Sequence, residues 1–178
     1  THGLRGERQY KVVANLPYYI ASPVIRHLLT ADVRPELMVV MVQEEVGRSM
    51  SAAPGDMSVL SVSVQVLAQV SIVRRVPARA FYPPPKVDSM VVRLETISEP
   101  AVPLDRIADF IEFVAAGFRS PRKHMRNSLA NGLGAPHQYV EALLARAGIE
   151  LSRRPETLAV AEWVRLWKLH ETTGNTPC

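Results

Sequence analysis

Residues 10–30 read YKVVANLPYYIASPVIRHLLT and predict a short strand that leads directly into a helix. Residues 10–14 are mostly apolar, as in a buried strand, and this strand ends at Asn15. Residues 23–29 predict the helix, because Ser22 can cap its N-terminus and a proline at the first helical position costs no hydrogen bond. A strand followed at once by a helix is typical of an α/β sheet.

The alternation of strands and helices continues beyond this stretch. Residues 37–42 are continuously apolar, which predicts a strand covered on both faces, and residues 43–50 predict a helix. Residues 58–66 alternate with period two and by pattern alone favour a strand. Residues 69–76 and 87–94 predict two further strands. These segments together indicate an α/β fold.

The composition changes near Pro100 and Pro103, which predict a linker between two domains. We expect an α/β domain over residues 1–98 and a small all-α domain over residues 99–178. The first strand of the α/β domain would be the one that leads into the loop at Asn15. A parallel sheet that starts with this strand would leave a long edge open to solvent. The Gly-rich first turn of a nucleotide-binding sheet is also absent. We therefore expect an N-terminal segment to be missing.

The second half of the chain has the pattern of a helical domain. Residues 104–118 carry apolar side chains at helical spacing. Residues 136–147 predict another helix, which Gly148 would close. A last helix is predicted to open at Arg154-Pro155-Glu156 and to carry Leu158, Trp163, Leu166 and Trp167.

The composition limits the kinds of function. The chain is 47% hydrophobic and 21% charged, as in globular proteins, and no apolar run approaches the roughly 18 residues of a membrane span. The single cysteine, Cys178, cannot form an internal disulfide, which suits a reducing cytoplasm. The five histidines lack the spacing of metal ligands, so no metal site is expected. The net charge of +4 favours a polyanionic partner such as nucleic acid.

The loop Asn15-Leu16-Pro17-Tyr18 resembles the Asn/Asp-Pro-Pro-Tyr/Phe loop of methyltransferases that act on adenine N6 or cytosine N4. The adenine amine is a poor nucleophile, because its lone pair is delocalised into the ring. The Asn15 oxygen and a carbonyl of Leu16 or Pro17 can accept its two N–H groups and localise that lone pair. Tyr18 offers a flat face for an extruded base, and S-adenosylmethionine would donate the methyl group. The alternative is an ordinary turn at the end of a strand.

Three motifs in sequence order make the resemblance specific: NLPYYI at residues 15–20, FYPPPKVDS at residues 81–89 and RKHMRNSL at residues 122–129. Together they resemble the small-subunit rRNA adenine N6,N6-dimethyltransferase family. The resemblance implies a Rossmann-like class I methyltransferase sheet, present here in part, followed by a small helical rRNA-binding domain. It also favours a helix over a strand for residues 57–67.

The activity implied by the resemblance is dimethylation of two adjacent adenosines near the 3′ end of small-subunit rRNA. It would take place in the cytoplasm during ribosome biogenesis, on the immature small subunit, and we expect a monomer. S-adenosylmethionine would lie against Asn15, Leu16 and Pro17. The rest of the family's donor pocket is absent, so we expect this chain alone to be inactive.

Further residues acquire roles from the same resemblance. Phe81 would stack on the face of the flipped adenine opposite Tyr18; otherwise it is a core aromatic beside a proline run. Lys86 could meet a phosphate or remain a solvated lysine. Asp88 and Ser89 are expected to be structural, as caps of the following strand.

A basic segment precedes residue 127 and contains Arg119, Arg122, Lys123 and Arg126. On a helix, Arg122 and Arg126 would share one face, and no acidic residue lies between them to offset their repulsion. A phosphate backbone would offset it, so we expect contact with RNA; the alternative is a solvated helix face.

Two other functions remain open. A large-subunit rRNA adenine dimethyltransferase shares the loop, but the long C-terminal domain with the RKHMRNSL motif favours the small-subunit enzyme. A non-catalytic rRNA-binding assembly factor on the same fold is the second alternative, and the intact Asn15 argues against it.

Overall fold

The computed structural model describes residues 10–174, so the expectations for Cys178 lie outside the described residues. The chain forms two compact units. The first holds residues 10–51 and 63–100, and the second holds residues 52–62 and 101–174. Within the described residues, no helix combines the length and the apolar character needed to cross a membrane.

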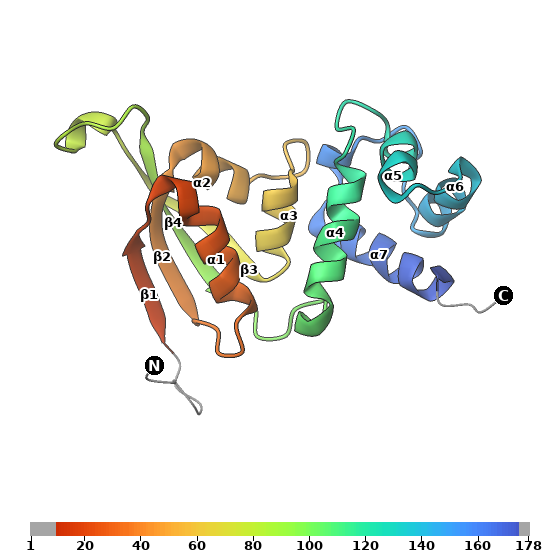
Figure 1. Cartoon of the computed structure of the whole chain (residues 1–178), viewed down its shortest axis with the longest axis horizontal. Helices are drawn as coiled ribbons and strands as arrows, with labels where there is room; N and C mark the ends of the chain where they lie inside the picture. Colours follow the sequence, from red (N-terminus) through yellow and green to blue (C-terminus); the bar gives the residue numbers. More distant parts are fainter. Residues whose placement is uncertain (1–9, 175–178) are drawn as a thin grey trace. The chain divides into compact units, whose positions relative to one another are not determined.

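A four-stranded sheet forms the first unit (Figure 1). Its strands are β1 (Lys11–Asn15), β2 (Leu37–Gln43), β3 (Ala68–Val76) and β4 (Ser89–Thr96), in the spatial order β1-β2-β4-β3. Strand β1 pairs with β2 in parallel, whereas β4 runs antiparallel to both β2 and β3. All four predicted strands are present, and the α/β class is confirmed.

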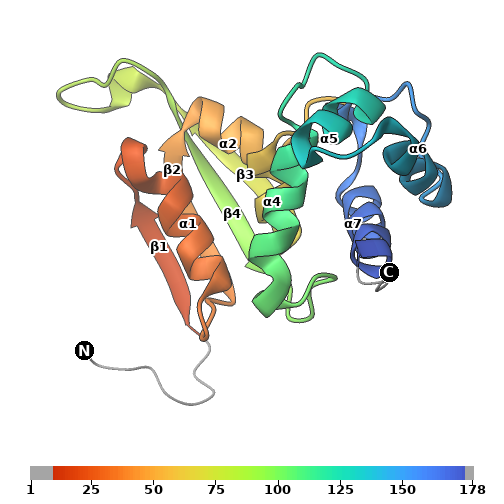
Figure 2. The ribbon, with the colours of Figure 1, turned by 45° about the vertical axis from the view of Figure 1, so that its right-hand side comes forward.

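The burial of these strands differs from the prediction. In β2, Met38, Val40 and Val42 are buried and the residues between them are only half-buried, so the strand is not covered equally on both faces. Helices α1 (Ala21–Thr30) and α2 (Glu44–Met50) lie over one face of the sheet (Figures 1 and 2). Strand β1 was expected to be buried, but it is an edge strand and Val13 is 82% exposed.

The helix after β1 starts earlier than predicted. A 3₁₀ turn, η1 (Tyr18–Ile20), runs into α1, which begins at Ala21 with Ile20 as its N-cap residue. Ser22 therefore lies inside the first turn and is not the cap, and no side chain caps this helix. The proline at position 23 is tolerated there because the first-turn N–H groups have no intrahelical acceptor.

The ambiguous segment after α2 is a helix, α3 (Val59–Gln65), as the family resemblance favours. Two serines explain why its alternating pattern does not form a strand. The Ser58 hydroxyl accepts the Ser61 N–H at 3.2 Å, and the Ser61 hydroxyl accepts the Ser58 N–H at 2.6 Å. This reciprocal pair starts the helix in the manner of a capping box.

The second unit is helical and consists mainly of α4 (Ile107–Gly117), α5 (Met125–Leu133), α6 (His137–Arg146) and α7 (Val160–Gly174). Its core pairs Phe110 with Trp167 and Phe113 with Trp163, edge to face, at centroid distances of 5.7 and 6.4 Å. The last helix begins at Val160, later than predicted, because η4 (Pro155–Thr157) is a separate 3₁₀ turn.

Two glycines have structural roles in this unit. Gly148 follows α6 with a φ of 65°, as expected for a residue that closes a helix. Gly132 lies against the backbone of α4, and a Cβ placed on it would come within 2.0 Å of the Ala116 carbonyl oxygen. Helices α4 and α5 therefore pack at a distance that only glycine permits.

Candidate active site

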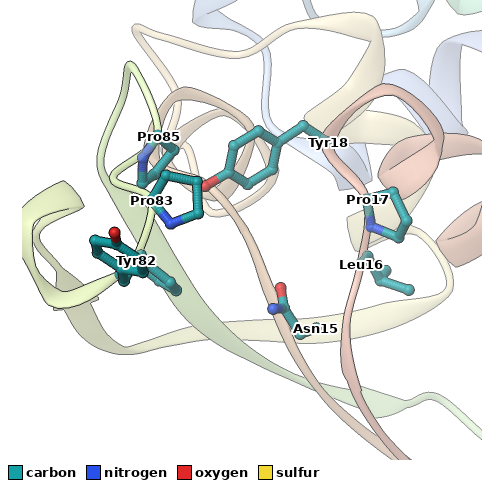
Figure 3. Close-up of a pocket in the computed structure, with 8 residues that line it drawn as sticks. Asn15, Leu16, Pro17, Tyr18, Tyr82, Pro83 and Pro85 are labelled. Carbon is teal, nitrogen blue, oxygen red and sulfur yellow. The ribbon is translucent and has the colours of Figure 1, made fainter.

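A pocket of about 380 Å³ lies where β1 ends, and two loops line it (Figure 3). One loop follows β1, and the other, residues 77–88, connects β3 to β4. Figure 3 shows Tyr82, Pro83 and Pro85 on one side, Leu16 and Pro17 on the other, and Asn15 and Tyr18 between them. The lining residues are Asn15, Leu16, Pro17, Tyr18, Phe81, Tyr82, Pro83 and Pro85.

The backbone of the first loop is fixed on both sides of Leu16. The Leu16 N–H donates to the Met41 carbonyl at 3.2 Å, which extends the pairing of β1 with β2 by one residue. The Pro17 carbonyl accepts the Ile20 N–H at 3.1 Å within η1. The Leu16 carbonyl is outside that turn, so it is better placed than Pro17 to accept a hydrogen bond from a ligand.

Tyr18 is held by a residue of another strand. Its hydroxyl lies 2.9 Å from the hydroxyl of Ser89, the fully buried first residue of β4. The bond fixes the half-buried Tyr18 ring within the pocket lining. The sequence predicted Ser89 only as a strand cap, because nothing in it indicates a bond across 71 positions.

The base of the second loop is pinned by Asp88. One carboxylate oxygen accepts the Ala78 N–H at 2.8 Å, and the other accepts from the Arg75 guanidinium. The Asp88 carbonyl also accepts the Glu44 N–H at 2.9 Å. Asp88 is structural as expected, but it ties together the two ends of the loop that carries Phe81.

Arg75 extends this network to α2. Its Nε donates to Glu44 at 2.8 Å, and Arg48 donates to the same carboxylate at 2.7 Å. The hydrogen bond from Arg48, and to a smaller extent the one from Arg75, lowers the pKa of the Glu44 carboxyl. Bonds to Glu44 and the nearby charge of Asp88 raise the pKa of Arg75. The network holds the loop to the sheet.

The predicted catalytic and base-stacking residues thus line one pocket, since Phe81 from the second loop lines it together with the first loop. Lys86 does not line it. It lies with Glu44, Glu45 and Asp88 along a second cavity of about 550 Å³, which also includes Arg48 and Val87.

The basic segment differs from its predicted form. Helix α5 begins only at Met125, so Arg119, Arg122 and Lys123 are exposed residues of the connection after α4. The cause is local: Pro121 lacks an N–H, and the Ser120 N–H donates to the Ser128 hydroxyl at 3.1 Å instead of continuing a helix. Arg122 and Arg126 therefore do not share a helix face.

Arg126 also has an acidic partner that the sequence spacing did not suggest. Its Nη1 lies 3.0 Å from the Glu141 carboxylate, which comes from α6. Glu141 therefore offsets the charge of Arg126, which, contrary to the prediction, does not need a phosphate partner. Arg119, Arg122 and Lys123 are in no ion pair with other described residues.

The chemistry of the pocket suits a flat heterocycle with an amine. Its lining residues carry one side-chain amide and several aromatic rings, and none of them carries a carboxylate. A methyl donor with a ribose would need further groups for its hydroxyls. Among residues 10–174, no cluster of three His, Cys, Asp or Glu side chains could hold a metal ion.

Comparisons with known proteins give a consistent result. The family model described as ribosomal RNA adenine dimethylase matches residues 3–171. A ribosomal RNA small subunit methyltransferase A from Dehalococcoides mccartyi is 51% identical over 169 residues, which are 95% of this chain and 57% of that protein. The protein of the same name from Pelotomaculum thermopropionicum is 44% identical over 165 residues, 91% of this chain and 56% of that protein. The chain thus spans little more than half the length of these relatives.

Solved structures show the same fold. A dimethyladenosine transferase from Plasmodium falciparum superposes with a TM-score of 0.82 at 23% identity, over 95% of this chain and 69% of that one. The 23S rRNA methyltransferase ErmE superposes with a TM-score of 0.69 at 26% identity, over 93% and 67% of the two chains.

Proposed function

Because the chain belongs to the ribosomal RNA adenine dimethylase family, we propose that this protein transfers methyl groups to N6 of adenine in small-subunit rRNA. The observation that carries the proposal is the pocket that Asn15 and Leu16 line together with the aromatic residues Tyr18 and Phe81. The relatives named above support the small subunit as the target.

The amine is activated by two acceptors. The Asn15 side-chain oxygen accepts one N6–H and the Leu16 carbonyl accepts the other, which draws the nitrogen towards tetrahedral geometry. The lone pair is then localised on the nitrogen and directed towards the incoming methyl group. The Leu16 carbonyl is held by its neighbours in the chain. Pro17 restricts the backbone directly after Leu16, and the bond from the Ile20 N–H to the Pro17 carbonyl fixes the turn that follows. S-adenosylmethionine would supply the methyl group and leave as a neutral thioether, and the methylated nitrogen would then lose a proton to solvent. Positioning is therefore the main requirement and no strong base is needed.

The base itself is held by stacking. Tyr18 and Phe81 contact opposite faces of the extruded adenine. The Ser89 hydroxyl fixes the Tyr18 ring, and the Asp88 network fixes the loop of Phe81. Rigid rings lose little entropy when the base enters, so the two loops are suited to hold it.

The remaining features fit a ribosomal substrate. The first unit carries the catalytic pocket, and the helical second unit contacts rRNA through Arg119, Arg122 and Lys123. Lys86 adds a weaker contact. The targets are two adjacent adenosines near the 3′ end of the rRNA in the immature small subunit, and the monomeric enzyme acts in the cytoplasm during ribosome biogenesis.

Mass spectrometry of rRNA nucleosides tests this function. A strain that lacks the gene should lose N6,N6-dimethyladenosine from its small-subunit rRNA, and the full-length protein should restore it. Loss from large-subunit rRNA alone would instead favour the activity of the second solved structure. Unchanged dimethyladenosine with defective subunit assembly would favour a non-catalytic assembly factor.

A further inference from the structure

Tyr82 is the most exposed large apolar side chain of the described residues. It is 100% exposed, although it also lines the pocket beside Phe81. Tyr19, at 84% exposed, is the other strongly exposed tyrosine of this unit, but it does not line the pocket. Exposed aromatics are common singly on protein surfaces, so the position of Tyr82 at the pocket distinguishes it.

The loop that carries Tyr82 is held in place. Prolines at positions 83, 84 and 85 follow the residue directly and restrict the backbone. The Asp88 carboxylate accepts the Ala78 N–H at 2.8 Å, which closes the loop at its base. Tyr82 is therefore presented to solvent by a restrained backbone, and a contact with its ring would cost little additional ordering.

The surroundings of Tyr82 suit RNA better than an apolar partner. Arg79 lies three positions before it, is exposed and is in no ion pair with other described residues. The net charge of the chain is +4. An exposed aromatic ring and an arginine without an ion pair in the same loop are the combination with which proteins bind single-stranded nucleic acid, through a base and its phosphate.

We propose that Tyr82 forms a second base subsite, which stacks on the nucleotide next to the adenine held between Tyr18 and Phe81. This inference rests on the proposed function, since it requires an extruded adenine in the pocket. Extrusion of one base leaves its neighbours without a stacking partner on one side, at a cost in free energy. The Tyr82 ring replaces that partner, and Arg79 contacts the phosphate between the two nucleotides.

A double-mutant cycle between protein and RNA tests the subsite. The full-length protein is assayed on small subunits reconstituted with unmodified rRNA, either intact or with an abasic residue beside the target adenosine. The variants are Tyr82→Ala, Tyr82→Phe, which keeps the ring, and Val87→Ala, which trims an exposed side chain of the same loop outside the pocket.

The expected result is a rise of about tenfold in KM for the subunit with Tyr82→Ala, within the range of one base–aromatic stack. The KM for the methyl donor and the kcat should not change, and Tyr82→Phe and Val87→Ala should behave as wild type. On the abasic subunit, wild type and Tyr82→Ala should have equal KM values, because the stacked base is gone.

Three outcomes would overturn the subsite. Equal KM values on intact subunits would mean that Tyr82 contributes nothing. The same penalty on intact and abasic subunits would assign Tyr82 to another contact, including one with a ribosomal protein. If the wild-type protein methylates no rRNA adenine, the proposed function and the subsite are both wrong. This outcome is seen with the wild-type protein alone, so it is distinguished from failure of the subsite only.

Discussion

The hydroxyl oxygens of Tyr18 and Ser89 lie 2.9 Å apart and connect the loop after β1 to the first residue of β4. Ser89 is fully buried, so its hydroxyl depends on this partner. Neither Tyr18→Phe nor Ser89→Ala should be neutral, because each leaves one hydroxyl without its partner. Combined, they should show a coupling of about 1 kcal/mol in the free energy of unfolding. Urea titrations followed by circular dichroism measure this, and strictly additive effects would mean that the bond is absent in solution.

Asn15 is expected to act on the reaction and not on RNA binding. Asn15→Ala removes one of the two acceptors for the adenine amine, and Asn15 is exposed, so the fold should tolerate the change. We expect kcat to fall on the order of 10²–10³-fold, as for other preorganised hydrogen-bonding groups. Methyl transfer and filter binding on the same subunits measure the two effects. Asn131→Ala, an exposed asparagine of α5, is the control. Equal loss of binding and transfer would assign Asn15 a structural role.

Asp88 should position Phe81 indirectly. Asp88→Ala removes the acceptor for the Ala78 N–H and the partner of Arg75. The loosened loop should lower methyl transfer by about 10- to 100-fold, the range expected for a displacement near 1 Å. Asp88→Asn keeps an acceptor oxygen and should lose less. The exposed Asp105 provides the control, Asp105→Ala. A normal rate for Asp88→Ala would show that the loop needs no such anchor.

The helical unit should be sensitive to a single methyl group at Gly132. A Cβ there would lie 2.0 Å from the Ala116 carbonyl oxygen, and a backbone atom cannot move aside cheaply. Gly132→Ala should destabilise this unit by about 1–3 kcal/mol or more. Both tryptophans of the chain, Trp163 and Trp167, belong to this unit, so their fluorescence reports its unfolding. Asn131→Ala should leave the transition unchanged, and a neutral Gly132→Ala would contradict the close packing of α4 and α5.

His170 should make the same unit less stable in mild acid. Burial lowers the pKa of His170 below its usual 6.5, against the opposing charge of Glu171, and its Nδ1 lies 2.7 Å from the Tyr139 hydroxyl. The folded state disfavours the charged ring, so the unfolded state binds more protons below about pH 6.5. Stability present above that pH is therefore lost as the pH falls towards the folded pKa.

Thermal unfolding between about pH 7.5 and about pH 5.5 should show this loss, and His170→Gln should reduce it. His137→Gln, at an exposed histidine of α6, should keep the wild-type pH dependence. The carboxyl of Glu162 also has a lowered pKa, mainly through Arg153, but it titrates below 4.5 and does not affect this range. An identical pH profile for His170→Gln and wild type would contradict the prediction.

The sequence predicted the parts of this structure that depend on local pattern. The four strands, the helix of residues 107–117 and the turn at Gly148 follow from apolar spacing and glycine chemistry. The convergence of Asn15 and Phe81 was predicted from the order of the family motifs, because no local pattern relates residues so far apart.

The parts that were missed depend on contacts that the sequence pattern does not indicate. The exposure of β1 follows from its place at the sheet edge, and the start of α5 follows from the bond between Ser120 and Ser128. The pairing of Arg126 with Glu141 and of Arg75 with Asp88 requires the folded chain. Charge spacing alone treated Arg126 as free for RNA.

The assignment of residues 52–62 to the second unit has a consequence for modularity. Within them, the Gly55 and Met57 N–H groups donate to the Glu156 carbonyl at 2.8 and 3.1 Å. A gene fusion or truncation that begins at residue 101 would omit this piece and leave that carbonyl without both donors. The helical unit is therefore not one continuous segment of the chain that could be moved by itself. Recombination could exchange the helical unit intact only if it also replaced residues 52–62, which lie within the sequence of the first unit. The two units are therefore expected to be inherited together.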